Sequence, residues 1–136
     1  MRDPNRNPNS DVENQLETNR IKAEAMLQSR VMPAFTQLSD ELHRPEQNQV
    51  VTIEPTSATS AELTLSGRQT DVGHGSAAVV PLRYQLKIAF DPRTIVVRRT
   101  VNGKEQGFLG QSNFASLSQR AIVDDVRREW RRAQNP

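Results

Sequence analysis

Residues 79–90 read VVPLRYQLKIAF, and over most of this stretch apolar and polar side chains alternate. The apolar positions on one side are Leu82, Tyr84, Leu86, Ile88 and Phe90. The polar positions between them are Arg83, Gln85 and Lys87. A period of two, with one apolar and one polar side, is typical of a strand in an antiparallel sheet that has one buried and one solvated face. The stretch therefore predicts a long strand around which the other elements can be placed.

Further strands are predicted before and after this one. QVVTIEP (49–55) and SAELTLSG (60–67) precede it, and TIVVRRTV (94–101) and the weaker KEQGFLG (104–110) follow it. Short connections join antiparallel neighbours, so the segments predict a meander of four or five strands. Residues 91–94 suit a β-turn because proline occupies its second position, and Asn102-Gly103 is typical of a two-residue hairpin loop.

The N-terminal third predicts a long helix. Its apolar residues recur at spacings of three, four or seven: Val12, Leu16, Ala23, Leu27, Val31, Ala34, Leu38 and Leu42. Pro33 removes a helical hydrogen bond, so the helix either kinks there or gives way to a second helix that starts at Pro33. Residues 1–10 are polar and rich in Asn and Pro, which predicts a disordered lead-in.

A final helix is predicted from about residue 116 or 118 to about residue 133. The order of helix, strands and helix predicts a single α+β domain over residues 11–136, with the helices on one face of the sheet. Within the last helix, VDDVRREWRRAQ (123–134) holds four arginines in six residues. On a helical wheel, Trp130 joins an apolar stripe with Ile122, Val126 and Ala133, so it is expected to be packed.

The arginines of this helix allow two interpretations. Asp124, Asp125 and Glu129 lie at spacings that suit ion pairs with them, which describes a solvated helix face. Alternatively, Arg127, Arg128 and Arg131 form an interaction surface for an acidic protein or for nucleic acid. Nucleic acid is the less expected partner, because the neighbouring carboxylates repel phosphate.

A second basic surface is predicted on the open face of the sheet. A turn at 91–94 makes the numbers of paired residues sum to 185, which sets Lys87 opposite Arg98. Arg83 lies two positions along on the same face, four residues before Lys87. Directly opposed like charges destabilise a sheet, which suggests an acidic partner or side chains that splay into water. The same register places Arg99 on the buried face, where a guanidinium needs a partner. We expect it to reach the sheet edge or an acidic residue such as Asp40 or Glu41.

Several classes of function are not indicated. The sequence has no cysteine, and its two histidines, His43 and His74, form no metal or catalytic pattern. No cofactor, metal or catalytic residue is predicted, and the protein is not expected to be an enzyme. No apolar run is long enough to span a membrane and the start has no signal-peptide pattern, so a cytoplasmic location is expected. Residues 1–78 carry a net charge of −4 and residues 79–136 one of +6, which indicates an anionic partner or mutually attracting halves.

The sequence thus favours a small non-catalytic interaction or structural module that self-associates. A helix over residues 11–32 would be about 33 Å long, whereas four or five strands are only about 20 Å across. Part of the helix should then overhang, and a second copy forming a homodimer would cover its apolar side chains: Leu16, Ala23, Leu27 and Val31. The alternative is a nucleic-acid-binding accessory protein that uses the Arg-rich C-terminal half.

Overall fold

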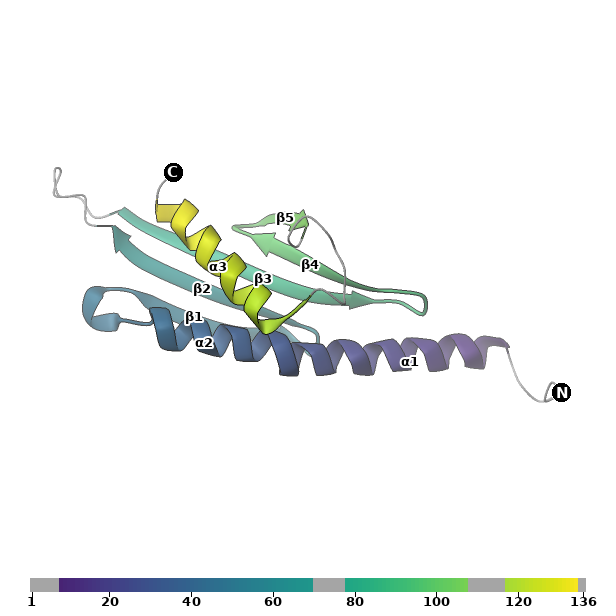
Figure 1. The fold of residues 1–136 in the computed structure, drawn as a ribbon. Coiled ribbons are helices and arrows are strands. Elements are labelled where there is room, and N and C mark those ends of the chain that lie inside the picture. Colours follow the sequence, from purple (N-terminus) through teal and green to yellow (C-terminus); the bar gives the residue numbers. More distant parts are fainter. Residues whose placement is uncertain (1–7, 70–77, 108–116, 135–136) are drawn as a thin grey trace.

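The computed structural model describes residues 8–69, 78–107 and 117–134. The helices are α1 (Pro8–Met26) and α2 (Met32–Leu42), joined by a π-helical turn (Leu27–Val31), and α3 (Gln119–Gln134). The strands are β1 (Val50–Ser57), β2 (Ser60–Gln69), β3 (Ala78–Phe90), β4 (Ile95–Val101) and β5 (Lys104–Gly107), and a 3₁₀ turn (Pro45–Gln47) precedes β1. The predicted α+β class and the meander order β1-β2-β3-β4-β5 are confirmed. Helices α1, α2 and α3 lie on one face of the sheet (Figure 1).

Strand β3 lies at the centre of the sheet, between β2 and β4. Four of its five predicted inward side chains are buried: Leu82, Tyr84, Leu86 and Ile88 are at most 1% exposed. The fifth, Phe90 at the end of the strand, is partly buried against the core. The predicted pairing with β4 is also confirmed, since Lys87 lies opposite Arg98 and Leu86 opposite Arg99. The alternation therefore fixes which side chains face the helices and which face solvent.

The predicted turns have the backbone geometry that their residues favour. Asn102 and Gly103 both have positive φ, 51° and 82°, as a type I′ hairpin requires. Asn102 also accepts a hydrogen bond from the backbone N–H of Arg83 at 2.8 Å, which ties the hairpin to β3. At the other turn, the carboxylate of Asp91 accepts the backbone N–H groups of Arg93 and Thr94 at 2.6 and 2.7 Å.

The helix does not end before Pro33 but passes into α2 through the π-helical turn. The N–H of Met32 donates to the carbonyl of Leu27, five residues back, and Pro33 follows in the first turn of α2. The N–H groups of the first turn of a helix have no acceptor within that helix, so a proline at this position loses no hydrogen bond. Of the two alternatives the structure shows the bend, in a helix that starts at Pro8. Residues 8–10 of the predicted lead-in are therefore helical, and residues 1–7 lie outside the described residues.

The overhang of this helix is shorter than the sequence suggested. Ala23, Leu27 and Val31 are at most 1% exposed and belong to the chain's own core, so they are not free to contact a second copy. The reason is direction: the helix runs along the strands rather than across them (Figure 1). At about 3.3 Å per residue β3 extends about 43 Å, whereas α1 through α2 spans about 52 Å. Only the start of α1 passes beyond the sheet.

Candidate functional site

Helix α3 packs on the sheet through the predicted apolar stripe. Ile122, Val126 and Trp130 are buried, with Trp130 only 6% exposed. The indole lies against the backbone of Gly67 in β2: a Cβ added at Gly67 would fall 2.7 Å from Trp130 Cη2. Trp130 is therefore a packed side chain, as predicted, and its ring is not a platform for stacking a base.

A buried charged cluster lies between α3 and the sheet. Arg99 Nε is 2.7 Å from Asp125 Oδ2, an ion pair that is not aligned as a hydrogen bond, and Arg99 NH2 is 2.7 Å from Glu129 Oε1. Tyr84 donates its hydroxyl to the same Asp125 oxygen at 2.6 Å. All four side chains are buried. The expectation that Arg99 would pair with Asp40 or Glu41 on the N-terminal helix, or reach the sheet edge, is wrong, because α3 rather than α2 covers this part of β4.

Burial and charge also determine the protonation of Tyr84. Burial, reinforced by the Asp125 carboxylate, raises the pKa of the Tyr84 hydroxyl well above its ordinary value, and Arg99 opposes this only in part. Tyr84 therefore keeps its proton and donates it to Asp125. The cluster is held in one arrangement, with each carboxylate oriented by a group on the sheet.

This arrangement changes the charge balance on the outer side of α3. Asp125 and Glu129 point inward to Arg99, so they are not exposed on the outer face of α3. Each still lies near one outer arginine: Arg128 is 3.6 Å from Asp125, and Arg132 is 3.3 Å from Glu129. The sequence had assigned both acids wholly to the outer face. Their spacing of four residues, each one position before the apolar stripe, was the available signal that they face inward.

Arg127 is held by a residue that sequence reasoning did not connect with it. Its guanidinium makes a forked contact with Glu41 of α2, with both Glu41 oxygens 2.9 Å from NH2, and it lies 3.4 Å from Asp124. Arg131, by contrast, is exposed and has no ion pair within the described part of the chain. The outer face of α3 thus contains one guanidinium with its hydrogen-bonding groups open to a partner.

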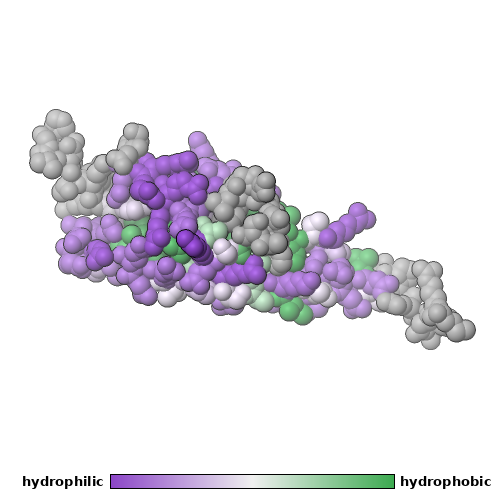
Figure 2. Space-filling view, in the orientation of Figure 1, coloured by the Kyte–Doolittle hydropathy of each residue, from purple (hydrophilic) through white to green (hydrophobic). Residues whose placement is uncertain are grey.

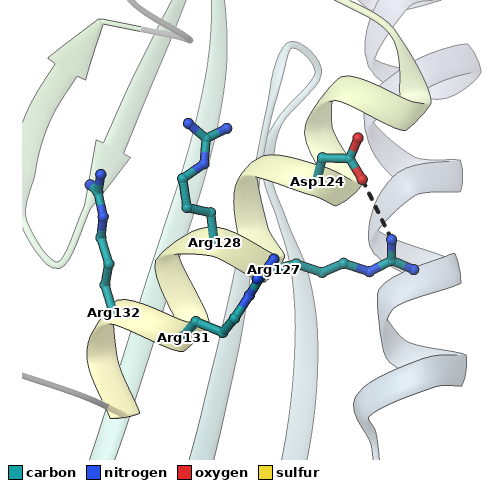
Figure 3. Close-up of a pocket in the computed structure, with 5 residues that line it drawn as sticks. All are labelled: Asp124, Arg127, Arg128, Arg131 and Arg132. Carbon is teal, nitrogen blue, oxygen red and sulfur yellow. Dashed lines mark hydrogen bonds and ion pairs between the residues drawn. The ribbon is translucent and has the colours of Figure 1, made fainter.

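Four arginines line an open hollow on this outer face, together with Asp124. We call the four the α3 arginine surface: Arg127, Arg128, Arg131 and Arg132. Figure 3 shows Arg127 directed toward the neighbouring helix, with Arg128 and Arg132 projecting on the other side of α3. Hydrophilic side chains gather over α3 in the space-filling view (Figure 2). The helix stacks these side chains in two neighbouring rows, because Arg127 and Arg131 are four residues apart, as are Arg128 and Arg132.

The second predicted basic surface lies on the opposite face of the sheet. There Arg83 is 3.2 Å from Glu62, and Arg98 is 2.7 Å from Glu105. Lys87 is exposed and lies across from Arg98. The structure therefore does not bring the two basic surfaces together, and carboxylates already partner two of the three cations on the sheet.

The exposed part of α1 forms a further candidate surface. Residues 11–18 are all exposed, and Val12 and Leu16 are 52% and 38% exposed. Of the four residues predicted for self-association, only Leu16 is accessible. A hollow separates this end of α1 from the β3–β4 turn and is lined by Asp11, Val12, Gln15, Asp91, Pro92 and Arg93.

Asn19 explains where the exposed part of α1 ends. It is 5% exposed and donates from Nδ2 to the carbonyl of Asp91 at 2.8 Å. It occupies the position where the helical repeat of apolar residues skips from Leu16 to Ala23. That skip was the sequence signal of a polar contact with the sheet.

The structure describes one of the two histidines. His43 ends α2, and its Nδ1 accepts the backbone N–H of Val51 at 3.1 Å, which is a structural contact. His74 lies outside the described residues. Across residues 8–69, 78–107 and 117–134, no group of three or more His, Cys, Asp or Glu side chains could hold a metal ion. Nor does any helix in these ranges have both the length and the apolar character needed to cross a membrane.

Comparison with known proteins gives no further assignment. The chain matches no protein-family model, and no curated protein or solved structure was found to be similar to it.

Proposed function

We propose that the protein is a small non-catalytic interaction module that binds an acidic protein surface through the α3 arginine surface. The observation that carries the proposal is that Arg131 is exposed and has no ion pair among the described residues. The residues three and four positions before it are Arg128 and Arg127, and Asp125 and Glu129 face inward to Arg99. Guanidinium groups bind carboxylates through paired, directional hydrogen bonds, and they are common in the centres of protein interfaces.

An acidic protein fits this surface better than nucleic acid does. Asp124 and Glu41 lie beside Arg127 and repel a phosphate backbone, whereas a folded partner can place its own carboxylates to avoid them. With Arg127 engaged, about three arginines remain for phosphates. At about 0.9 in log–log salt slope per contact, three contacts leave little affinity at physiological salt.

A fluorescence titration at physiological ionic strength tests the proposal. The probes are a labelled poly-glutamate peptide, duplex DNA, single-stranded DNA and RNA. Binding of the acidic peptide that is lost in the double variant Arg128→Glu/Arg131→Glu supports it. The matched control is Lys87→Glu, which makes the same kind of charge change on the opposite face of the sheet and should leave binding unchanged. Tight binding of a nucleic acid that is lost in the same double variant would contradict the choice of partner.

Self-association through the start of α1 is a second proposed property. The observation behind it is that eight consecutive helical residues, 11–18, are exposed on all sides. An exposed helical end gains little stability from its own hydrogen bonds, so an added contact would hold it in place. A solution mass twice that of the chain supports this property.

The proposed location is the cytoplasm, and the lack of cysteine fits a reducing compartment.

A further inference from the structure

We propose that the partner of the α3 arginine surface is the exposed start of α1 from a second copy of this chain. The inference rests on the proposed function, since it names the acidic surface that the arginines bind. It joins two surfaces that are both exposed in one copy and that have opposite charge.

The start of α1 is acidic along its accessible length. Residues 8–18 contain three carboxylates, Asp11, Glu13 and Glu17, and no basic residue. Glu17 is partnered by Arg20 in the next turn, whereas Glu13 is exposed and has no ion pair in the described part of the chain. Glu13 on one copy and Arg131 on another are therefore matched in charge and in accessibility.

Apolar side chains flank these charges. Val12 and Leu16, one turn apart on α1, are the exposed apolar residues nearest to Glu13. On the receiving helix, the arginine side chains present long aliphatic stems below their charged ends, which can cover such residues. The contact would thus exclude water from Val12 and Leu16 while the guanidinium groups remain at its edge.

The two surfaces lie apart within one copy, so the contact requires two. Figure 1 shows the start of α1 projecting beyond the sheet, away from α3. Residues 8–18 form about 16 Å of helix, which α3, about 24 Å long, can seat along its length. In a two-fold dimer the α1 start of each copy binds the α3 arginine surface of the other. The contact then forms twice, and the assembly is complete with two copies.

The size of this contact predicts a weak dimer. Half the surface of a helix about 10 Å in diameter and 16 Å long is about 250 Å². Two reciprocal contacts, each with two sides, bury about 1,000 Å², which is at the lower end for a specific interface. Because exposed ion pairs are screened by salt, the dimer should weaken as ionic strength rises.

Sedimentation velocity on the full chain at low and high salt tests the inference. The wild type should dimerise at low salt, and either Glu13→Arg or Arg131→Glu should raise the dimer Kd by about tenfold or more. An equimolar mixture of these two variants should dimerise again, because each α1 start then meets an α3 of opposite charge in both contacts. The controls Glu46→Arg and Lys87→Glu change charge by the same amounts at exposed sites elsewhere and should leave the Kd unchanged.

The outcomes separate this inference from the proposed function. A wild-type monomer at every concentration overturns the dimer, while loss of poly-glutamate binding in Arg131→Glu would still support an acid-binding surface. A dimer that is insensitive to Arg131→Glu but lost in Leu16→Glu overturns the pairing with α3 and leaves self-association standing. Failure of the mixed variants to recover the dimer overturns the reciprocal contact.

Discussion

Arg99 occupies a position where the alternation of β4 calls for an apolar side chain. The sequence correctly placed it on the buried face, because the turn at 91–94 fixes the register between β3 and β4. It did not identify Asp125 and Glu129 as its partners, because the position of α3 on the sheet depends on packing between elements far apart in the chain. Strand pairing is thus predictable from local pattern, whereas the buried charged cluster is not.

Replacing Arg99 with methionine should destabilise the protein by about 3–5 kcal/mol. The substitution leaves Asp125 and Glu129 buried without their cation, which is the costly way to break a buried ion pair. The triple variant Arg99→Met/Asp125→Asn/Glu129→Gln removes the charges together and should recover most of this loss. Urea unfolding measures both, and a loss of under 1 kcal/mol for Arg99→Met would show that the cluster is not buried as described.

Gly67→Ala should also destabilise the fold, by about 1–3 kcal/mol, because the new methyl group would lie 2.7 Å from Trp130. Trp130→Phe removes the part of the ring that approaches Gly67, so the alanine should cost less in that background. A double-mutant cycle by chemical denaturation measures this coupling. Strictly additive effects would contradict the contact.

The stability of the protein should fall as the pH rises above about 10. Unfolded tyrosine ionises near pH 10, whereas the buried Tyr84 in the folded state has a higher pKa, so that unfolding releases a proton in this range. Tyr84 is the only tyrosine, so tyrosinate absorbance follows this group alone. An ordinary titration near pH 10 in the folded protein would contradict its burial.

Among the elements, the β4–β5 hairpin depends on a backbone conformation rather than on a contact. Gly103 has a φ of 82°, and a Cβ added there would meet nothing within 4 Å. Gly103→Ala should therefore cost about 1–2 kcal/mol from backbone strain alone, whereas Gly103→Asn should cost less, since asparagine tolerates this region. Thermal unfolding of the two variants checks this. Equal losses of stability in both variants would contradict backbone strain as the cause.

The elements also show where reasoning from sequence reached its limit. The turns and strand periods predicted the meander, because these signals are local. The direction of α1 relative to the strands is a tertiary property that the sequence does not give. The predicted overhang was too long because the helix length was compared with the width of the sheet, whereas the helix runs along the strands. Asn19, at the skipped apolar position, marks its true limit.

For the whole molecule, Leu27 and Leu16 should respond differently to the same substitution. Leu27→Glu buries a charge in the core and should unfold the protein, because Leu27 is 1% exposed. Leu16→Glu lies on the exposed start of α1 and should leave the fold intact while weakening association. Circular dichroism and solution mass separate the two effects, and a folded Leu27→Glu monomer would contradict the assigned core.

Some of the opposite charges of residues 1–78 and 79–136 form ion pairs with each other within the fold. Arg127 with Glu41, and Arg83 with Glu62, join a basic side chain from residues 79–136 to an acidic one from residues 1–78. Part of the charge asymmetry therefore supports intramolecular contacts, and part of the remaining positive charge lies on the α3 arginine surface.

The meander order has a consequence for how the chain folds during synthesis. Each strand lies beside the one made just before it, so the sheet can form from contacts that are close in sequence, which favours rapid folding. Helix α3 follows all five strands in the chain and carries both carboxylates that neutralise Arg99. A nascent chain that has completed β5 therefore holds a guanidinium and the apolar side chains around it without their cover. The docking of α3 on the sheet then follows the completion of β5, guided by the attraction between this cation and the two approaching acids.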